Sequence, residues 1–229
     1  MKSLEKMPKA ENIPALNINN EGLKRHSLLS IFVPEPTLSA DDRKLRSWLL
    51  HTLTTAARHY TKARELVALQ DSADQVKDGG MIFYVFDVSE HIEGCVTAMY
   101  RLCMAIKRMS SAAIPVDEFC QEFEKYFSAL CSIRNQFEHM HSQIVASETG
   151  SGPISIAFGD DGRSIRFRKL KMETAHLHIL VEGAYKLISG MYPTFNVDSA
   201  PEPIGHAKLT MTATVTFIDE NSDLQELGK

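Results

Sequence analysis

The segment Arg134–His139 holds the side chains of this sequence that are best suited to chemistry. An arginine guanidinium binds a phosphate group through two parallel hydrogen bonds. A histidine titrates near neutral pH, so it takes up and releases a proton readily. His141 follows two residues after His139, and either imidazole is therefore a candidate partner for Arg134.

The residues around this segment predict a helix that is buried along one side. Apolar residues recur alternately four and three positions apart: Phe119, Phe123, Tyr126, Leu130, Ile133, Phe137, Met140 and Ile144. At about 100° per residue, Glu138 lies roughly 40° from Arg134 and His141 roughly 20° from it on the other side. His139 lies about 140° round the same helix. An ideal helix therefore brings Arg134 closer to His141 than to His139, and it gives Arg134 and Glu138 the spacing of an ion pair.

The chain divides into three predicted parts. Residues 1–38 are expected to form an N-terminal arm, whose apolar piece at 28–33 packs on the main body. Residues 39–192 are expected to form a helical bundle. Residues 193–229 are expected to form a C-terminal extension, with a strand at 208–218 where Thr and Val alternate with other residues.

Four amphipathic helices are predicted within the bundle. The first runs from Ser39, whose hydroxyl and the nearby Asp42 carboxylate suit a helix start, to about residue 77. The second begins near Ile82, with a short extended entry through residues 83–88 as an option. The third has Asp117 as its N-cap and ends before residue 150. The fourth covers 173–191. The fold class is thus mainly α: an antiparallel four-helix or five-helix bundle with a β-hairpin inserted before the last long helix.

The predicted hairpin occupies residues 153–171. Alternating apolar residues flank the turn sequence Asp160-Asp161-Gly162. Its second strand carries Arg163, Arg166 and Arg168, the candidate substrate-binding residues. These cations are expected either to contact an anion or to protect the strand from misassociation.

The motif resembles the signature of HEPN domains. In that family an arginine, a polar residue, a short spacer and a histidine lie in the middle of a four- or five-helix bundle, as Arg134, Asn135 and His139 do here. His141 also falls within the spacing that the family allows. The resemblance covers residues 40–192, although its specific part is short.

The resemblance implies a metal-independent endoribonuclease that acts as a homodimer on RNA. Arg134 would hold the scissile phosphate, His139 or His141 would move the proton of a 2′-hydroxyl, and Asn135 would orient an imidazole. Glu138 is a departure, because its charge competes with phosphate for Arg134. Other members of the family are non-catalytic dimerisation or interaction modules, often with an antitoxin or another protein partner in toxin–antitoxin and defence systems.

A third alternative is a di-metal carboxylate bundle. The pairs Glu138/His141 and Glu173/His176 both have the carboxylate–imidazole spacing that such sites use. The two pairs lie on adjacent helices, unlike the ferritin-like arrangement, so the preferred prediction is a site without a metal or cofactor.

Composition limits the other function classes. The formal net charge of −4 argues against a broad basic surface for duplex nucleic acid. The four cysteines form no Cys-x-x-Cys pair, which is typical of free thiols in a reducing cytosol. No apolar run approaches the roughly 20 residues of a membrane span, so we expect a cytoplasmic protein without a membrane partner.

Overall fold

The computed structural model describes residues 8–30, 39–72, 81–108, 116–146 and 155–192 of the 229-residue chain. Its α-helices are α1 (Asn20–Ser30), α2 (Ala40–Ser72), α4 (Met81–Lys107), α5 (Val116–Glu138), α6 (Met140–Val145) and α7 (Thr174–Gly190). The shorter elements are the 3-10 helices η2 (Ala10–Asn12) and η3 (Asp160–Gly162) and the strands β1 (Ala157–Gly159), β2 (Ser164–Phe167) and β3 (Leu170–Glu173). The predicted fold class, a helical bundle with a small antiparallel sheet before the last long helix, is confirmed.

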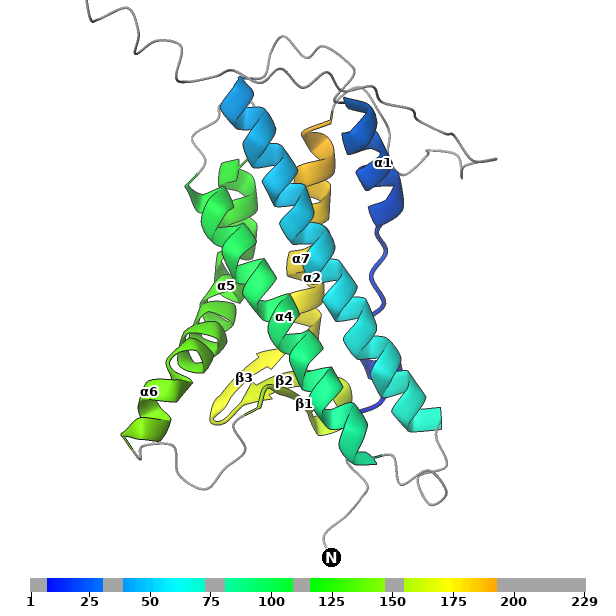
Figure 1. Cartoon of the computed structure of the whole chain (residues 1–229), viewed down its shortest axis with the longest axis vertical. Coiled ribbons are helices and arrows are strands. Elements are labelled where there is room, and N and C mark those ends of the chain that lie inside the picture. The colour runs from blue at the N-terminus through cyan, green and yellow to red at the C-terminus, as the bar shows by residue number, and fades with distance from the viewer. Residues whose placement is uncertain (1–7, 31–38, 73–80, 109–115, 147–154, 193–229) are drawn as a thin grey trace, which may run out of the picture.

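Helices α2, α4, α5 and α7 form the bundle. The most extensive packing is between α2 and α4. Helix α5 packs on α4, and α7 lies against both α2 and α5 (Figure 1). The sheet closes the lower end of the bundle in this view, with β1 against α4 and β3 against α5. This arrangement places the end of α5 beside the sheet.

Apolar residues three and four positions apart on the predicted amphipathic helices form the core. Buried members on α2, α4 and α7 are Leu49, Leu53, Ala56, Tyr60, Ala63, Val67, Ile92, Val96, Met99, Cys103, Ile106, Leu177, Leu180, Ala184 and Leu187. On α5, Leu130 and Ile133 are almost completely buried, and Phe137 packs partly buried against the core. Ile144 is the exception, since it lies on α6 at the end of the bundle and is 46% exposed.

The helix starts agree only partly with the prediction. Ser39 caps α2 as expected, because its Oγ accepts a hydrogen bond from the Asp42 amide at 3.1 Å and donates one to the Asp42 carboxylate at 2.7 Å. Asp117 is not the N-cap of α5, because that helix already begins at Val116 and Asp117 lies in its first turn. The extended entry to the second helix is also wrong, since α4 is helical from Met81.

The hairpin is part of a three-stranded meander in the order β1-β2-β3. The turn before β2 is where the sequence places it, with Asp161 and Gly162 at positive φ (62° and 93°). Lys169 does not continue the second strand, because a tight turn with Arg168 at φ 55° reverses the chain there. After this turn, β3 pairs with β2, and its apolar residues Leu170 and Met172 alternate with polar ones.

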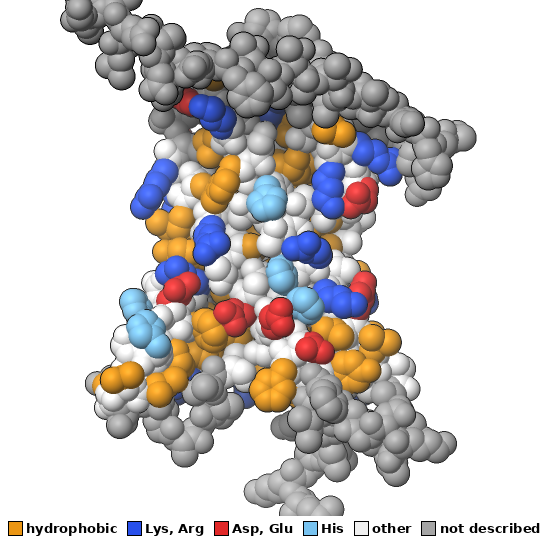
Figure 2. Space-filling model, in the orientation of Figure 1, with side chains coloured by type: hydrophobic (Ala, Val, Ile, Leu, Met, Phe, Trp, Pro, Cys, Tyr) orange, Lys and Arg blue, Asp and Glu red, His pale blue; other side chains and the backbone are white. Residues whose placement is uncertain are grey.

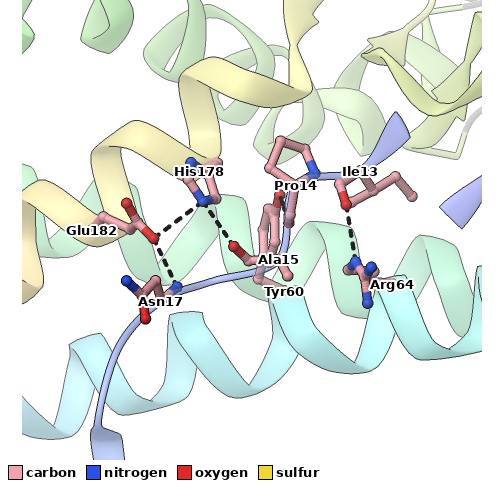
Figure 3. Close-up of polar contacts among 8 residues, drawn as sticks. All are labelled: Ile13, Pro14, Ala15, Asn17, Tyr60, Arg64, His178 and Glu182. Atoms are coloured by element: carbon pink, nitrogen blue, oxygen red, sulfur yellow. Dashed lines mark hydrogen bonds and ion pairs between the residues drawn. The ribbon is translucent and has the colours of Figure 1, made fainter. Parts of the chain in front are cut away.

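The N-terminal arm packs on the bundle through residues 9–17. Ile13 is buried, and side chains of α2 and α7 hold the backbone on either side of it (Figure 3). The contacts are Arg64 Nε to Ile13 O (2.9 Å), Tyr60 Oη to Pro14 O (2.9 Å), His178 Nε2 to Ala15 O (3.1 Å) and Asn17 N to Glu182 Oε1 (2.8 Å). Leu28, in the piece expected to pack, is instead 57% exposed.

The C-terminal strand and the lack of a membrane-spanning helix are two further expectations from the sequence. The predicted strand at 208–218, like residues 31–33 of the arm, lies outside the described residues. Among the helices that the structure describes, none has the length and apolarity needed to cross a membrane.

Candidate functional site

Arg134 is held in place by residues of two helices. Its guanidinium lies over the ring of Tyr100 from α4, 4.5 Å from the ring centroid. Its Nη2 pairs with Glu138 Oε1 at 3.0 Å, and its Nη1 donates to Asn135 Oδ1 at 3.3 Å. The predicted ion pair with Glu138 is therefore confirmed, and the side chain is only 24% exposed. Asn135 contacts Arg134 in this structure rather than an imidazole.

The partner of Arg134, Glu138, lies close enough to a second carboxylate, Glu93 of α4, for their charges to interact. Partial burial raises the pKa of the Glu93 carboxyl on α4, and the charges of Glu138 and Glu90 raise it further. Figure 2 shows acidic side chains grouped low on the face over α2 and α4. The local field therefore opposes the approach of an anion unless Arg134 offsets it.

His139 stands at a break between two helices. α5 ends at Glu138 and α6 begins at Met140, while His139 has φ −90° and ψ 3°. Its side chain is exposed and makes no hydrogen bond or ion pair with a described residue. The ideal-helix angle that separates His139 from Arg134 thus does not apply unchanged, and the imidazole is open to solvent.

His141 is also exposed, but its ring is engaged locally. Its Nδ1 lies 3.1 Å from the carbonyl oxygen of Glu138, and its Nε2 lies 3.1 Å from the hydroxyl of Ser142. No contact joins either imidazole to Arg134 among the described residues. The structure therefore places the five candidate residues on one stretch of chain without closing them into a single hydrogen-bonded cluster.

The three hairpin arginines differ in their surroundings. Arg163 is exposed and pairs with Asp161 at 3.4 Å. Arg166 is exposed on β2, where its stem covers Gly159 so closely that a Cβ there would meet Arg166 Cδ at 2.5 Å. Arg168 donates to Gln143 Oε1 of α6 at 2.7 Å, which ties the β2–β3 turn to the end of the motif helix. Arg168 thus links the hairpin directly to the motif region.

The residues of the di-metal alternative have other partners. Glu173 pairs with Lys171 at 2.9 Å, and the His176 ring packs on Tyr126 with 4.5 Å between centroids. Across the ranges the structure describes, no three His, Cys, Asp or Glu side chains come together as a metal site would require.

A second polar region, on the outer face between α2 and α4, was not predicted from the sequence. His59 and His91 face each other across the two helices with 2.9 Å between their Nδ1 atoms. Gly94 makes this possible, because a Cβ there would lie 2.8 Å from the His59 ring. Burial, then the charges of His91 and Arg58, lower the pKa of His59. Histidines 32 residues apart carry no local spacing signal, so only packing reveals the pair.

Comparison of the chain with protein-family models, curated proteins and solved structures found no match. The interpretation of the site therefore depends on the contacts described above.

Proposed function

We propose that this chain is a HEPN-like, metal-independent endoribonuclease that acts as a homodimer. The observation that carries the proposal is the helix break at His139, which leaves an unpartnered, exposed imidazole one turn beyond an oriented guanidinium. The nature of these two groups, rather than any similarity of the whole chain, supports the assignment.

The chemistry needs one cation and one proton carrier at the scissile phosphate. Arg134 binds the phosphate oxygens, since Tyr100 fixes the plane of its guanidinium and the phosphate takes the place of Glu138 at Nη2. A histidine takes the proton of the 2′-hydroxyl, whose oxygen then attacks the phosphorus while the bond to the 5′-oxygen breaks. The second copy's histidine protonates the departing oxygen, so His139 or His141 serves in each protomer. Arg168, linked to α6, extends the anion contact towards the hairpin.

This mechanism requires the Glu138 carboxylate to leave Arg134 when phosphate binds. This carboxylate occupies Arg134 in the free protein at 3.0 Å, and a bound phosphate displaces it. An ion pair between residues four apart on a helix is worth only about 0.3–0.5 kcal/mol, which a bidentate phosphate contact exceeds.

The test is cleavage of labelled single-stranded RNA by the purified full-length chain in EDTA. We expect wild-type cleavage, and a loss of at least about 100-fold in Arg134→Ala combined with His139→Ala. Arg43→Ala is the matched control, because Arg43 is an exposed arginine of α2 far along the chain from the motif. Separate His139→Ala and His141→Ala variants identify the proton carrier. Unchanged cleavage by the Arg134/His139 double variant refutes the proposal.

A second candidate is a non-catalytic HEPN-like interaction module. It is favoured by the engagement of Arg134 with Glu138 and by the exposed apolar side chains of α6, where Val145 is 84% exposed. A wild-type protein that cuts no RNA but forms a dimer that Val145→Glu dissociates would select this candidate over the ribonuclease.

A further inference from the structure

An open groove runs along the outer face of the bundle between α2 and α4. Its volume is about 420 Å³, within the range of small-ligand sites. Trp48 and His51 of α2 and Arg101 of α4 border it, and the small residues Gly94, Thr97 and Ala98 line it. The absence of bulky side chains at these three positions of α4 leaves the space open.

Trp48 offers an aromatic surface in this groove. It is the only tryptophan of the chain and is 43% exposed, although tryptophan side chains are mostly buried. An accessible indole is a platform on which a planar base stacks, with a contribution of about 1–3 kcal/mol per base.

Arg101 offers an available cation in the same groove. Its side chain is exposed and makes no hydrogen bond or ion pair with a described residue. A guanidinium that is not engaged in the free protein binds a phosphate without first breaking a contact. His51, one helical turn from Trp48, adds a second donor on this border.

Glu93, the carboxylate that lines the groove, lies away from Arg101. Glu93 precedes Arg101 by eight residues of α4, which separates their backbones by about 12 Å. One end of the groove therefore combines an aromatic surface with positive charge, and the opposite end carries Glu93 and His59.

We propose that the α2–α4 groove binds a nucleotide, with the base stacked on Trp48 and the phosphate held by Arg101. A simple anion would make no use of the indole, and an uncharged planar molecule would make no use of the guanidinium. This binding goes beyond the proposed ribonuclease function, because it requires neither Arg134 nor the motif histidines.

The sole tryptophan makes the test direct. Adenosine 5′-monophosphate is titrated into the full-length chain in EDTA, with the fluorescence of Trp48 and isothermal calorimetry as two readouts. We expect a saturable change with the nucleotide, weaker binding of adenosine, and no fluorescence change with inorganic phosphate. Arg101→Gln should weaken nucleotide binding about tenfold. Trp48→Ala should weaken it about tenfold by calorimetry, while Trp48→Phe retains most of the affinity.

Arg58→Gln is the matched control, because Arg58 is an exposed arginine of α2 that borders a neighbouring depression instead. We expect it to change the affinity by less than about twofold. Absence of saturable nucleotide binding in both readouts overturns the proposal, as does equal weakening by Arg58→Gln and Arg101→Gln. The Arg134→Ala/His139→Ala variant should bind the nucleotide normally, so a failure of RNA cleavage and a failure of this site are separate results.

Discussion

Two arginines with the same charge have opposite surroundings in this molecule. Arg134 rests on Tyr100 and pairs with Glu138. Arg101, which follows Tyr100 on α4, lines a groove and makes no hydrogen bond or ion pair with a described residue. Consecutive residues, Tyr100 and Arg101, thus serve two different sites. The neighbouring side chains therefore determine whether a guanidinium is oriented and engaged, as in Arg134, or exposed and available to a ligand, as in Arg101.

The largest expected effect on stability is the difference between removing Arg134 and removing Arg101. Arg134→Met should lower the free energy of unfolding by about 1–1.5 kcal/mol, because it loses the cation–π contact and the ion pair and leaves Glu138 near Glu93. Arg101→Met should change it by less than about 0.5 kcal/mol. Urea unfolding at neutral pH measures both, and equal losses in the two variants would remove the distinction.

A smaller effect is expected at Glu93, where burial and the charges of Glu138 and Glu90 raise the carboxyl pKa. The folded protein then binds a proton more readily than the unfolded chain, so this site loses stability as pH rises from the unfolded value of 4.5 through the folded pKa. Glu93→Gln should therefore be more stable than wild type at pH 7, by no more than about 1 kcal/mol because Glu93 is only partly buried and solvent screens its charge.

The gain in Glu93→Gln should shrink when urea unfolding is repeated near pH 4. Glu122→Gln, an exposed carboxylate on α5, is the control and should show no such pH-dependent gain. A gain that stays constant between the two pH values would exclude the raised pKa as its cause.

The smallest effect is expected at His59, which lines the same groove as Arg101. Its pKa is lowered by burial and by the charges of His91 and Arg58, which the charge of Glu90 opposes. A lowered histidine pKa stabilises the fold above the unfolded value of 6.5, and that contribution is lost as pH falls from 6.5 through the folded pKa.

His59→Gln should therefore flatten the decline in stability between about pH 7.5 and 5.5, measured as the urea midpoint. His51→Gln, an exposed histidine of the same helix, is the control and should keep the wild-type slope. If the His59 variant keeps that slope as well, the His59–His91 contact does not contribute to the pH dependence.

Much of the fold follows from local patterns. The seams of α2, α4, α5 and α7 repeat every three or four residues, so each helix and its buried face are readable without its partners. The Ser39 cap and the Arg134–Glu138 pair also depend on residues three and four apart. The turn at Asp161-Gly162 is predicted because the residue types suit positive φ.

Other features depend on distant segments and had no local signal. The sequence did not indicate that the chain reverses at residues 168–169 and continues as β3, because alternation in a short run does not reveal where a chain reverses. It also did not indicate that α5 stops at Glu138, since the apolar stripe continues at Met140.

The sequence by itself determined the four long helices, their buried faces and the presence of an arginine–histidine motif at the end of α5. Only the tertiary structure decided which side chains meet: it places Tyr100 beneath Arg134 and His59 against His91, and it brings Trp48 and Arg101 to one groove. The physical reason is that helix periodicity is a property of neighbouring residues in the chain. The partner of a side chain is set by which helix faces meet, and that depends on the packing of the whole bundle.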